Sequence, residues 1–189
     1  MNQRAISRIL AYQEKKRTHP SKKSYVLDTR VPQYAIALID TSIPMPITLD
    51  KKITEVINTE FFPVVNSAER ARKIYDWVQE NVVYGESKRR MFSVGYRSAL
   101  ETVQGNEGVC GEMAYVYVTL ARASGLKSSY VRVFKDYAGR KVCHACAGVH
   151  LPDLLLVDPA YATYDIKHQD FKEINDSEMI RLFSEWRAA

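Results

Sequence analysis

The 189-residue sequence lacks the features that mark secreted and membrane-spanning proteins. No run of apolar residues reaches the roughly 18 that a membrane span requires, so no membrane partner is expected. Residues 1–8 lack the apolar core of a secretory signal, which predicts a cytoplasmic location. With only three cysteines, the chain is expected to carry reduced thiols rather than a disulfide framework.

The net charge of +5 is unevenly distributed along the chain. Residues 1–30 contain eight Lys and Arg residues but only Glu14 and Asp28 as acids, so this part carries +6 and the remainder −1. We expect residues 1–24 to form a solvated basic arm or short helix, and nucleic acid is not an expected partner. A contact of this arm with nucleic acid or an acidic protein is the alternative.

Residues 25–189 are numerous enough to form one domain with its own core. Apolar residues at helical spacing, or in one nearly uninterrupted run, predict a series of helices. These helices cover residues 49–62, 67–81, 98–103, 110–123 and 176–186. Residues 104–108 are expected to form a loop, and Gly125 to end the central helix over 110–123.

Strands are predicted mainly in the second half of the chain, where β-branched and aromatic residues alternate between turn signals. They cover residues 128–134, 141–150 and 154–157, and shorter extended segments are expected at 25–27 and 34–39. Helices followed by a three-stranded antiparallel meander indicate the α+β class. The helix that begins at Cys110 is expected to pack on this sheet.

The most informative motif is Gly108-Val109-Cys110-Gly111-Glu112, which leads directly into the apolar run. A cysteine at the start of a helix lies beside unpaired backbone N–H groups and the positive end of the helix dipole, both of which stabilise a thiolate. Free cysteines are often buried structural residues instead. The flanking glycines favour the functional interpretation, because they let a substrate backbone approach closely.

A histidine and a carboxylate follow this cysteine in separate strand segments. His144 lies 34 residues after Cys110, and Asp158 lies 14 residues further on. A thiol, an imidazole and a carboxylate from separate elements form the arrangement of a base-activated nucleophile, which points to acyl chemistry on amides. The alternatives are a structural strand histidine and, before Pro159, a turn-forming aspartate.

Three motifs, in this order, resemble those of a known family: Gly108–Glu112, His144–Cys146 and Leu156–Tyr161. The chain resembles the transglutaminase-like superfamily, relatives of the papain-like cysteine enzymes, over about residues 67–162. The resemblance implies a papain-like core with a nucleophile helix packed on an antiparallel sheet. It also implies that Cys110 is the nucleophile, His144 the general base and acid, and Asp158 the residue that orients His144.

Amide cleavage also needs hydrogen-bond donors for the oxyanion. The backbone N–H of Cys110 is one candidate by its position. Gln104 precedes Cys110 by six residues, a spacing that resembles that of the papain-like enzymes. Transglutaminases resemble one another in using an upstream aromatic residue, for which Tyr84 and Trp77 are candidates. Loop polarity explains Gln104 equally well, and core packing explains Trp77.

Cys146 departs from the family pattern, which commonly has an aromatic residue two positions after the histidine. On a strand Cys146 and His150 share a face with His144, so Cys146 is a possible modulator that could oxidise against Cys110. Cys143, Cys146 and His150 also suggest a zinc site. The opposite faces of positions 143 and 146 argue against it, and we expect neither metal nor cofactor.

These observations predict a cysteine-dependent acyl-transfer enzyme that acts on protein or peptide amides through a thioester, most simply a peptidase. Cross-linking by a lysine amine and cleavage of a glycan amide use the same acyl-enzyme and are alternatives. The non-enzymatic alternative is a catalytically degenerate module. Such a module would bind peptides or partner proteins through the cleft in which an active relative binds its substrate. The sequence carries no signal for the oligomeric state.

Overall fold

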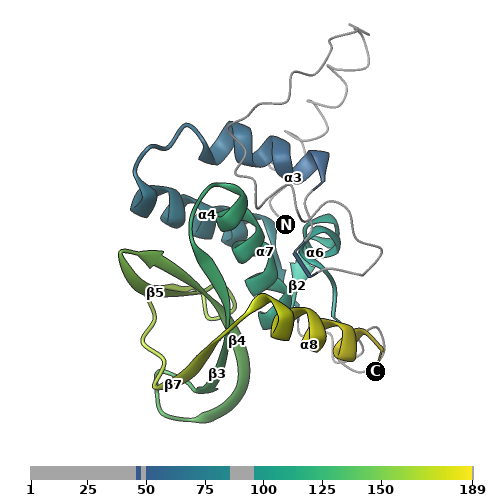
Figure 1. Ribbon diagram of the computed structural model, residues 1–189, viewed down its shortest axis with the longest axis vertical. Helices are drawn as coiled ribbons and strands as arrows, with labels where there is room; N and C mark the ends of the chain where they lie inside the picture. Colours follow the sequence, from purple (N-terminus) through teal and green to yellow (C-terminus); the bar gives the residue numbers. More distant parts are fainter. Residues whose placement is uncertain (1–45, 48–49, 86–95, 189) are drawn as a thin grey trace, which may run out of the picture. The chain divides into compact units, whose positions relative to one another are not determined.

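The computed structural model describes residues 46–47, 50–85 and 96–188, and Figure 1 shows their arrangement. The helices are α3 (Lys51–Val56), its π-helical continuation η1 (Ile57–Phe61), α4 (Ser67–Asn81), α6 (Ala99–Gly105), α7 (Cys110–Ala123) and α8 (Asp176–Ala188). The strands are β1 (Val83–Tyr84), β2 (Glu107–Gly108), β3 (Ser128–Lys135), β4 (Lys141–Leu151), β5 (Asp153–Asp158), β6 (Thr163–Tyr164) and β7 (Asp170–Ile174). The predicted basic arm and the extended segments at 25–27 and 34–39 lie outside the described residues.

The main sheet has five strands in the order β6-β5-β4-β3-β7, and all of its neighbouring strands are antiparallel. Its centre is the predicted meander of β3, β4 and β5, which confirms the α+β class. The sheet is larger than the predicted meander, because β6 and β7 were not recognised. β6 has two residues, and four of the five residues of β7 are exposed, so neither strand shows a clear hydrophobic alternation.

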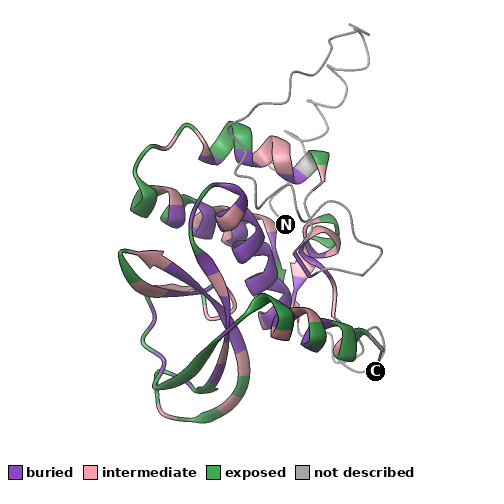
Figure 2. Cartoon of the chain, in the orientation of Figure 1, coloured by how far each residue is buried: buried purple, intermediate pink, exposed green. Residues whose placement is uncertain are grey.

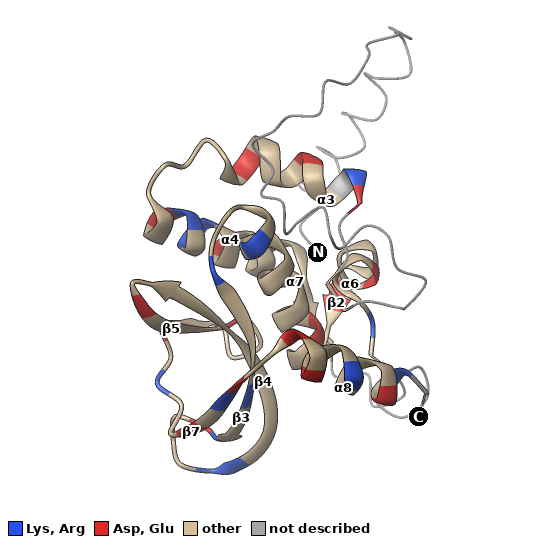
Figure 3. Ribbon diagram, in the orientation of Figure 1, with Lys and Arg blue, Asp and Glu red and all other residues tan. Residues whose placement is uncertain are grey.

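Helix α7 begins at Cys110 as predicted and forms the centre of the core. Its charged residues lie at its ends, Glu112 in the first turn and Arg122 in the last, and the stretch between them is buried (Figures 2 and 3). Gly125 ends the helix with φ of +85°, and the Leu126 N–H donates back to the Ala121 carbonyl at 2.9 Å. No helix in the described part of the chain combines the length and apolar character needed to cross a membrane.

The two faces of β4 contribute to two different clusters of buried residues. Ala145, Ala147 and Val149 belong to the main core, together with the apolar residues of α7. Cys146 belongs to a smaller cluster, with Val131 of β3 and Leu156 of β5. This alternation confirms that even-numbered residues of β4 share one face, and it sets the direction in which His144 points.

Helix α4 has the predicted bounds, Ser67–Asn81. Asn66 accepts the N–H groups of Ala68 and Glu69, so it caps the helix. Its buried residues are Ala71, Ile74, Tyr75 and Val78, which lie on one face of the helix. The helix predicted over 49–62 is present as α3 and η1, and the Asp50 side chain caps it by accepting the Ile53 N–H at 2.7 Å.

The loop predicted over 104–108 is wrong at both ends, where residues 104–105 are helical and residues 107–108 form a strand. Helix α6 continues to Gly105, because a capping box between Ser98 and Glu101 fixes its start and the left-handed Asn106, with φ of 53°, ends it. The next two residues form β2, which pairs in parallel with β1. This pairing places Tyr84 level with Gly108, two residues before Cys110.

Candidate active site

Cys110 is the first residue of α7. A buried ion pair between Arg97 and Glu112, which lies in the first turn of the same helix, holds the chain around Cys110. Arg97 NH2 lies 3.0 Å from Glu112 Oε2, and these side chains are only 13% and 5% exposed. Glu112 also accepts the backbone N–H groups of Arg97 at 2.8 Å and Val109 at 3.1 Å. A second bond runs from Arg97 NH2 to the carbonyl of Glu107. The pair therefore ties the chain before Cys110 to the first turn of the helix.

We expect Glu112→Ala to lower the free energy of unfolding by about 3–5 kcal/mol, because it leaves the Arg97 charge buried without its partner. Urea denaturation measures this loss. Asp76→Ala is the matched control, since it breaks the exposed Arg72–Asp76 pair and should cost no more than about 0.5 kcal/mol. Equal losses for the two variants would contradict a structural role for the buried pair.

The glycines beside Cys110 are explained by packing inside the protein. A Cβ at Gly108 would lie 2.8 Å from Thr102 Cγ2. A Cβ at Gly111 would lie 2.6 Å from Tyr96 Cε1 and 2.9 Å from the Tyr130 hydroxyl. Glycine is therefore needed at positions 108 and 111 because of these neighbouring side chains. The expectation that the glycines serve the close approach of a substrate is not needed to explain them.

His144 of β4 and Asp158 of β5 form a buried hydrogen-bonded pair. His144 Nε2 lies 2.7 Å from Asp158 Oδ2, and the side chains are 7% and 0% exposed. Because β4 and β5 pair with Ala147 opposite Val157, Asp158 lies two residues along the same strand face from His144. The sheet register therefore brings together two side chains that are 14 residues apart in sequence.

The pair with Asp158 fixes which nitrogen of His144 carries the proton. An ionised carboxylate only accepts, so Nε2 donates, and Nδ1 is the nitrogen left for the hydrogen bond with the Cys110 side chain. Burial lowers the pKa of His144, but the hydrogen bonds with Asp158 and Cys110 outweigh it and raise the pKa to about 9. The imidazole is therefore set to stay protonated beside the thiol at neutral pH.

Asp158 remains ionised although it is fully buried. Burial raises the pKa of its carboxyl, but hydrogen bonds from His144 and His168 and from the Tyr161 N–H reverse this and lower the pKa. The Tyr161 N–H donates to Oδ1 at 3.0 Å, while both histidines use Oδ2. Each oxygen of the carboxylate is thus occupied and its orientation is fixed.

His168 is the site residue that the sequence prediction missed. Its side chain is 0% exposed, and its Nε2 lies 3.0 Å from Asp158 Oδ2. His168 lies just before β7 in the sequence. Because β7 was not recognised as a strand of the sheet, the return of the chain towards Asp158 was not predicted either. The only sequence signal was its rarity, because the chain has four histidines.

Tyr161 covers the pair of His144 and Asp158. Its ring stacks on the His144 ring with a centroid distance of 4.4 Å and an interplanar angle of 18°. It also meets the His168 ring edge-on at 5.9 Å. An aromatic cover over the hydrogen bond excludes water, which strengthens the electrostatic interaction beneath it.

Comparison with known proteins agrees with this arrangement. A family model described as the transglutaminase-like superfamily matches residues 50–158, more than half of the chain. The chain belongs to the transglutaminase-like superfamily. A search of curated protein sequences found no match.

Two solved structures share the transglutaminase-like fold at low sequence identity. A protein described as a candidate cysteine protease from Cytophaga hutchinsonii is 17% identical, with a TM-score of 0.52; the match covers 79% of this chain and 56% of that one. LapG from Legionella pneumophila, in an EGTA-treated form, is 10% identical with a TM-score of 0.51. The match covers 78% of this chain and 98% of the LapG chain. This chain thus spans only about half the length of the Cytophaga protein.

The three oxyanion candidates of this transglutaminase-like chain lie in different places. Trp77 packs edge-on against Phe61, with ring centroids 6.4 Å apart. Gln104 is exposed near the end of α6. Tyr84 lies beside Gly108 in the short parallel ladder, next to the segment that leads into Cys110. Their roles remain predictions, and Tyr84 has the most favourable position.

Cys146 is the residue by which this chain departs from the superfamily pattern. It is fully buried, and burial, followed by the charges of Asp158 and Cys110, raises the pKa of its thiol. Cys143 on the other face is exposed. Among the described residues, the clustered metal-type ligands are His144, Asp158 and His168, and no cysteine belongs to this group. The oxidation of Cys146 against Cys110 remains a prediction that burial disfavours.

Proposed function

We propose that this chain is a cysteine hydrolase that cleaves protein or peptide amides through a thioester on Cys110. The observation that carries the proposal is the chain of hydrogen bonds from the Cys110 side chain to His144 and from His144 to Asp158. It joins a nucleophile, a base and an orienting carboxylate in the roles that acyl transfer requires. Membership of the transglutaminase-like superfamily supports the same roles.

The reaction starts from the state in which the Cys110 proton has already passed to Nδ1 of His144, as the raised pKa of His144 favours. The thiolate attacks the amide carbonyl carbon, and the carbonyl π electrons move to oxygen to form an oxyanion. As the intermediate collapses, the C–N bond breaks and the leaving nitrogen takes the proton from His144. The products are a thioester on Cys110 and a free amine.

In the second half, His144 removes a proton from water, which attacks the thioester carbonyl. Collapse of this intermediate breaks the C–S bond, releases the carboxylic acid and returns the proton to Cys110. A primary amine in place of water would form a new amide instead. His168 acts as a positioning residue, because it holds the Asp158 oxygen that His144 uses.

The products formed from a mixture of unmodified peptides test the proposed reaction. We expect mass spectrometry to find new carboxyl termini, and a fluorescent primary amine added at millimolar concentration to be incorporated in only a minor fraction. Predominant amine incorporation would favour cross-linking over hydrolysis. The absence of both products would contradict an acyl-transfer enzyme and favour the non-enzymatic binding module.

A further inference from the structure

A pocket of about 730 Å³ lies next to the candidate active site. This volume is within the range of about 300–1,000 Å³ that is typical of ligand sites. The turn between β3 and β4 forms one side of the pocket, and the segment from the end of β5 towards β7 forms the other. Its lining residues are Tyr137, Arg140, Tyr161, Thr163, Ile166 and Lys167.

Tyr161 is the wall shared by the pocket and the active site. One face of its ring stacks on His144, and its ring also meets that of Tyr137 edge-on, with centroids 6.1 Å apart. The pocket is therefore bordered by the same tyrosine ring that stacks on His144. Ile166, from the same buried cluster as Cys146, adds an apolar surface.

The proton pathway determines which part of a substrate meets this pocket. His144 gives its proton to the leaving nitrogen, so the leaving segment must lie on the His144 side of Cys110. The pocket adjoins this histidine, because Tyr161 lines the pocket and stacks on the His144 ring. The acyl segment, which stays attached to Cys110, would extend elsewhere.

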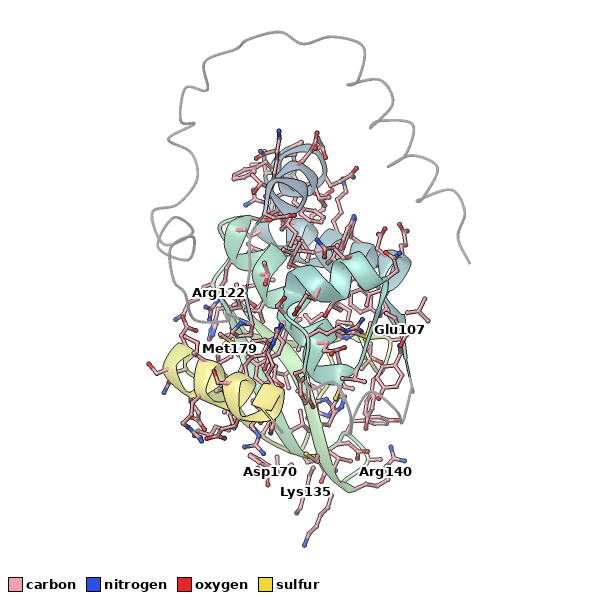
Figure 4. The ribbon with its side chains drawn as sticks, turned by 90° about the vertical axis from the view of Figure 1, so that its right-hand side faces the viewer. Glu107, Arg122, Lys135, Arg140, Asp170 and Met179 are labelled. Carbon is pink, nitrogen blue, oxygen red and sulfur yellow. The ribbon has the colours of Figure 1, made fainter. Side chains whose placement is uncertain are left out.

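The exposed charge in the pocket is mainly positive. Arg140 binds Asp136 Oδ2 through Nε and NH2, both at 2.7 Å, but Asp136 is 0% exposed while Arg140 is 67% exposed. The backbone N–H groups of Ala138 and Arg140 occupy the other oxygen of Asp136. The buried carboxylate therefore holds the guanidinium in place, and its exposed side faces outward. Figure 4 shows Arg140 at the outer end of the β3–β4 hairpin.

Lys167 adds a second cation to the pocket. It is 78% exposed and lies 2.6 Å from Asp165, which is 47% exposed. This surface pair is weak, so Lys167 can exchange its partner for a carboxylate of a ligand at little cost. The two cations come from different segments of the chain that both line the pocket.

We propose that this pocket binds the leaving segment of the substrate and selects an acidic residue within the first few positions after the cleaved amide. The aromatic walls of Tyr137 and Tyr161 would hold the aliphatic part of that residue. Arg140, with Lys167, would pair with its carboxylate, for which a fixed guanidinium is well suited. This inference rests on the proposed function, since it names the substrate class of the same site.

Matched peptides that differ only in the residues after the cleaved bond test the proposal. We expect kcat/KM to be about tenfold higher with glutamate than with glutamine there, and the preference to weaken at high salt. Lys167→Gln and Arg140→Gln should each reduce the preference. Lys167→Gln is the safer variant, because Arg140 also neutralises buried Asp136. Lys127→Gln, on an exposed residue outside the pocket lining, should leave the preference unchanged.

A binding measurement separates failure of the pocket from failure of the proposed function. In the Cys110→Ala variant, the peptide Gly-Glu-Glu-Gly should shift the NMR signals of the pocket residues, and Gly-Gln-Gln-Gly should not. Hydrolysis without a glutamate preference, and without these shifts, would overturn the pocket and leave the hydrolase intact. Glutamate-specific shifts without any hydrolysis would support the pocket and overturn the proposed reaction.

Discussion

Cys110→Ala is expected to lower the rate of peptide-amide hydrolysis by about 10⁴-fold or more, since removing the nucleophile leaves only binding and oxyanion stabilisation. The reason is specific to this thiol, because Cys110 alone among the three cysteines is hydrogen-bonded to His144 in the described structure. Initial rates with the best peptide found in the mixture measure the loss.

Cys143→Ala is the matched control for this variant. Cys143 is an exposed thiol on the strand that carries His144, and it is next to that residue in sequence. We expect its replacement to change the rate by less than about twofold, as for a surface substitution away from the site. A large loss of hydrolysis rate with Cys143→Ala and none with Cys110→Ala would show that Cys143 is the nucleophile, which would contradict the proposed role of Cys110.

Asp158→Asn is expected to reduce kcat by about 10³–10⁴-fold and to change the pH dependence. An asparagine amide can donate to Nε2 of His144, which favours the tautomer that has its proton on the nitrogen facing Cys110. The pKa of His144, now about 9, should fall towards its ordinary value, because the bond and the charge of Asp158 are among the causes that raise it.

The sign of the pH effect follows from the protonated imidazole. In the wild type, His144 carries its proton below about pH 9 and loses it as the pH rises through this value. In Asp158→Asn the alkaline limb of kcat/KM should move to lower pH. An unchanged alkaline limb would show that Asp158 does not support the charge on His144.

His168 allows a graded test of the same network. His168→Phe keeps a ring but removes the donor to Asp158, and we expect about a 10–100-fold loss of activity with a smaller shift of the alkaline limb. His168→Gln retains an N–H donor and should recover part of the activity. A purely packing role would give the opposite order, since phenylalanine fills the buried space better than glutamine.

The parts of the fold that were predicted correctly are those with strong local signals. Helix α4 has a cap and a regular apolar stripe, and α7 has a nearly continuous apolar run that ends at a left-handed glycine. The sequence singled out Cys110, His144 and Asp158 by their order and flanking motifs, and the structure places the three side chains in one hydrogen-bonded chain. The hydrogen bond between His144 and Asp158 depends on the register of β4 and β5, which the structure shows and the strand pattern did not predict.

The parts that were missed depend on contacts between distant segments. Strand β7 is mostly exposed, so its sequence lacks the alternation that identifies a half-buried strand. His168 has no local motif, and only the return of the chain beside Asp158 makes it part of the site. Gly111 was explained by substrate access, whereas packing against Tyr96 and Tyr130 explains it.

The rate of iodoacetamide labelling as a function of pH, with mass spectrometry to locate the modified cysteine, tests the central claim most directly. The account predicts rapid labelling of Cys110 below pH 7 in the wild type and markedly slower labelling in His144→Ala, because the imidazolium stabilises the thiolate. Preferential labelling of Cys143, or equal labelling of Cys110 in both proteins, would contradict a thiol activated by His144.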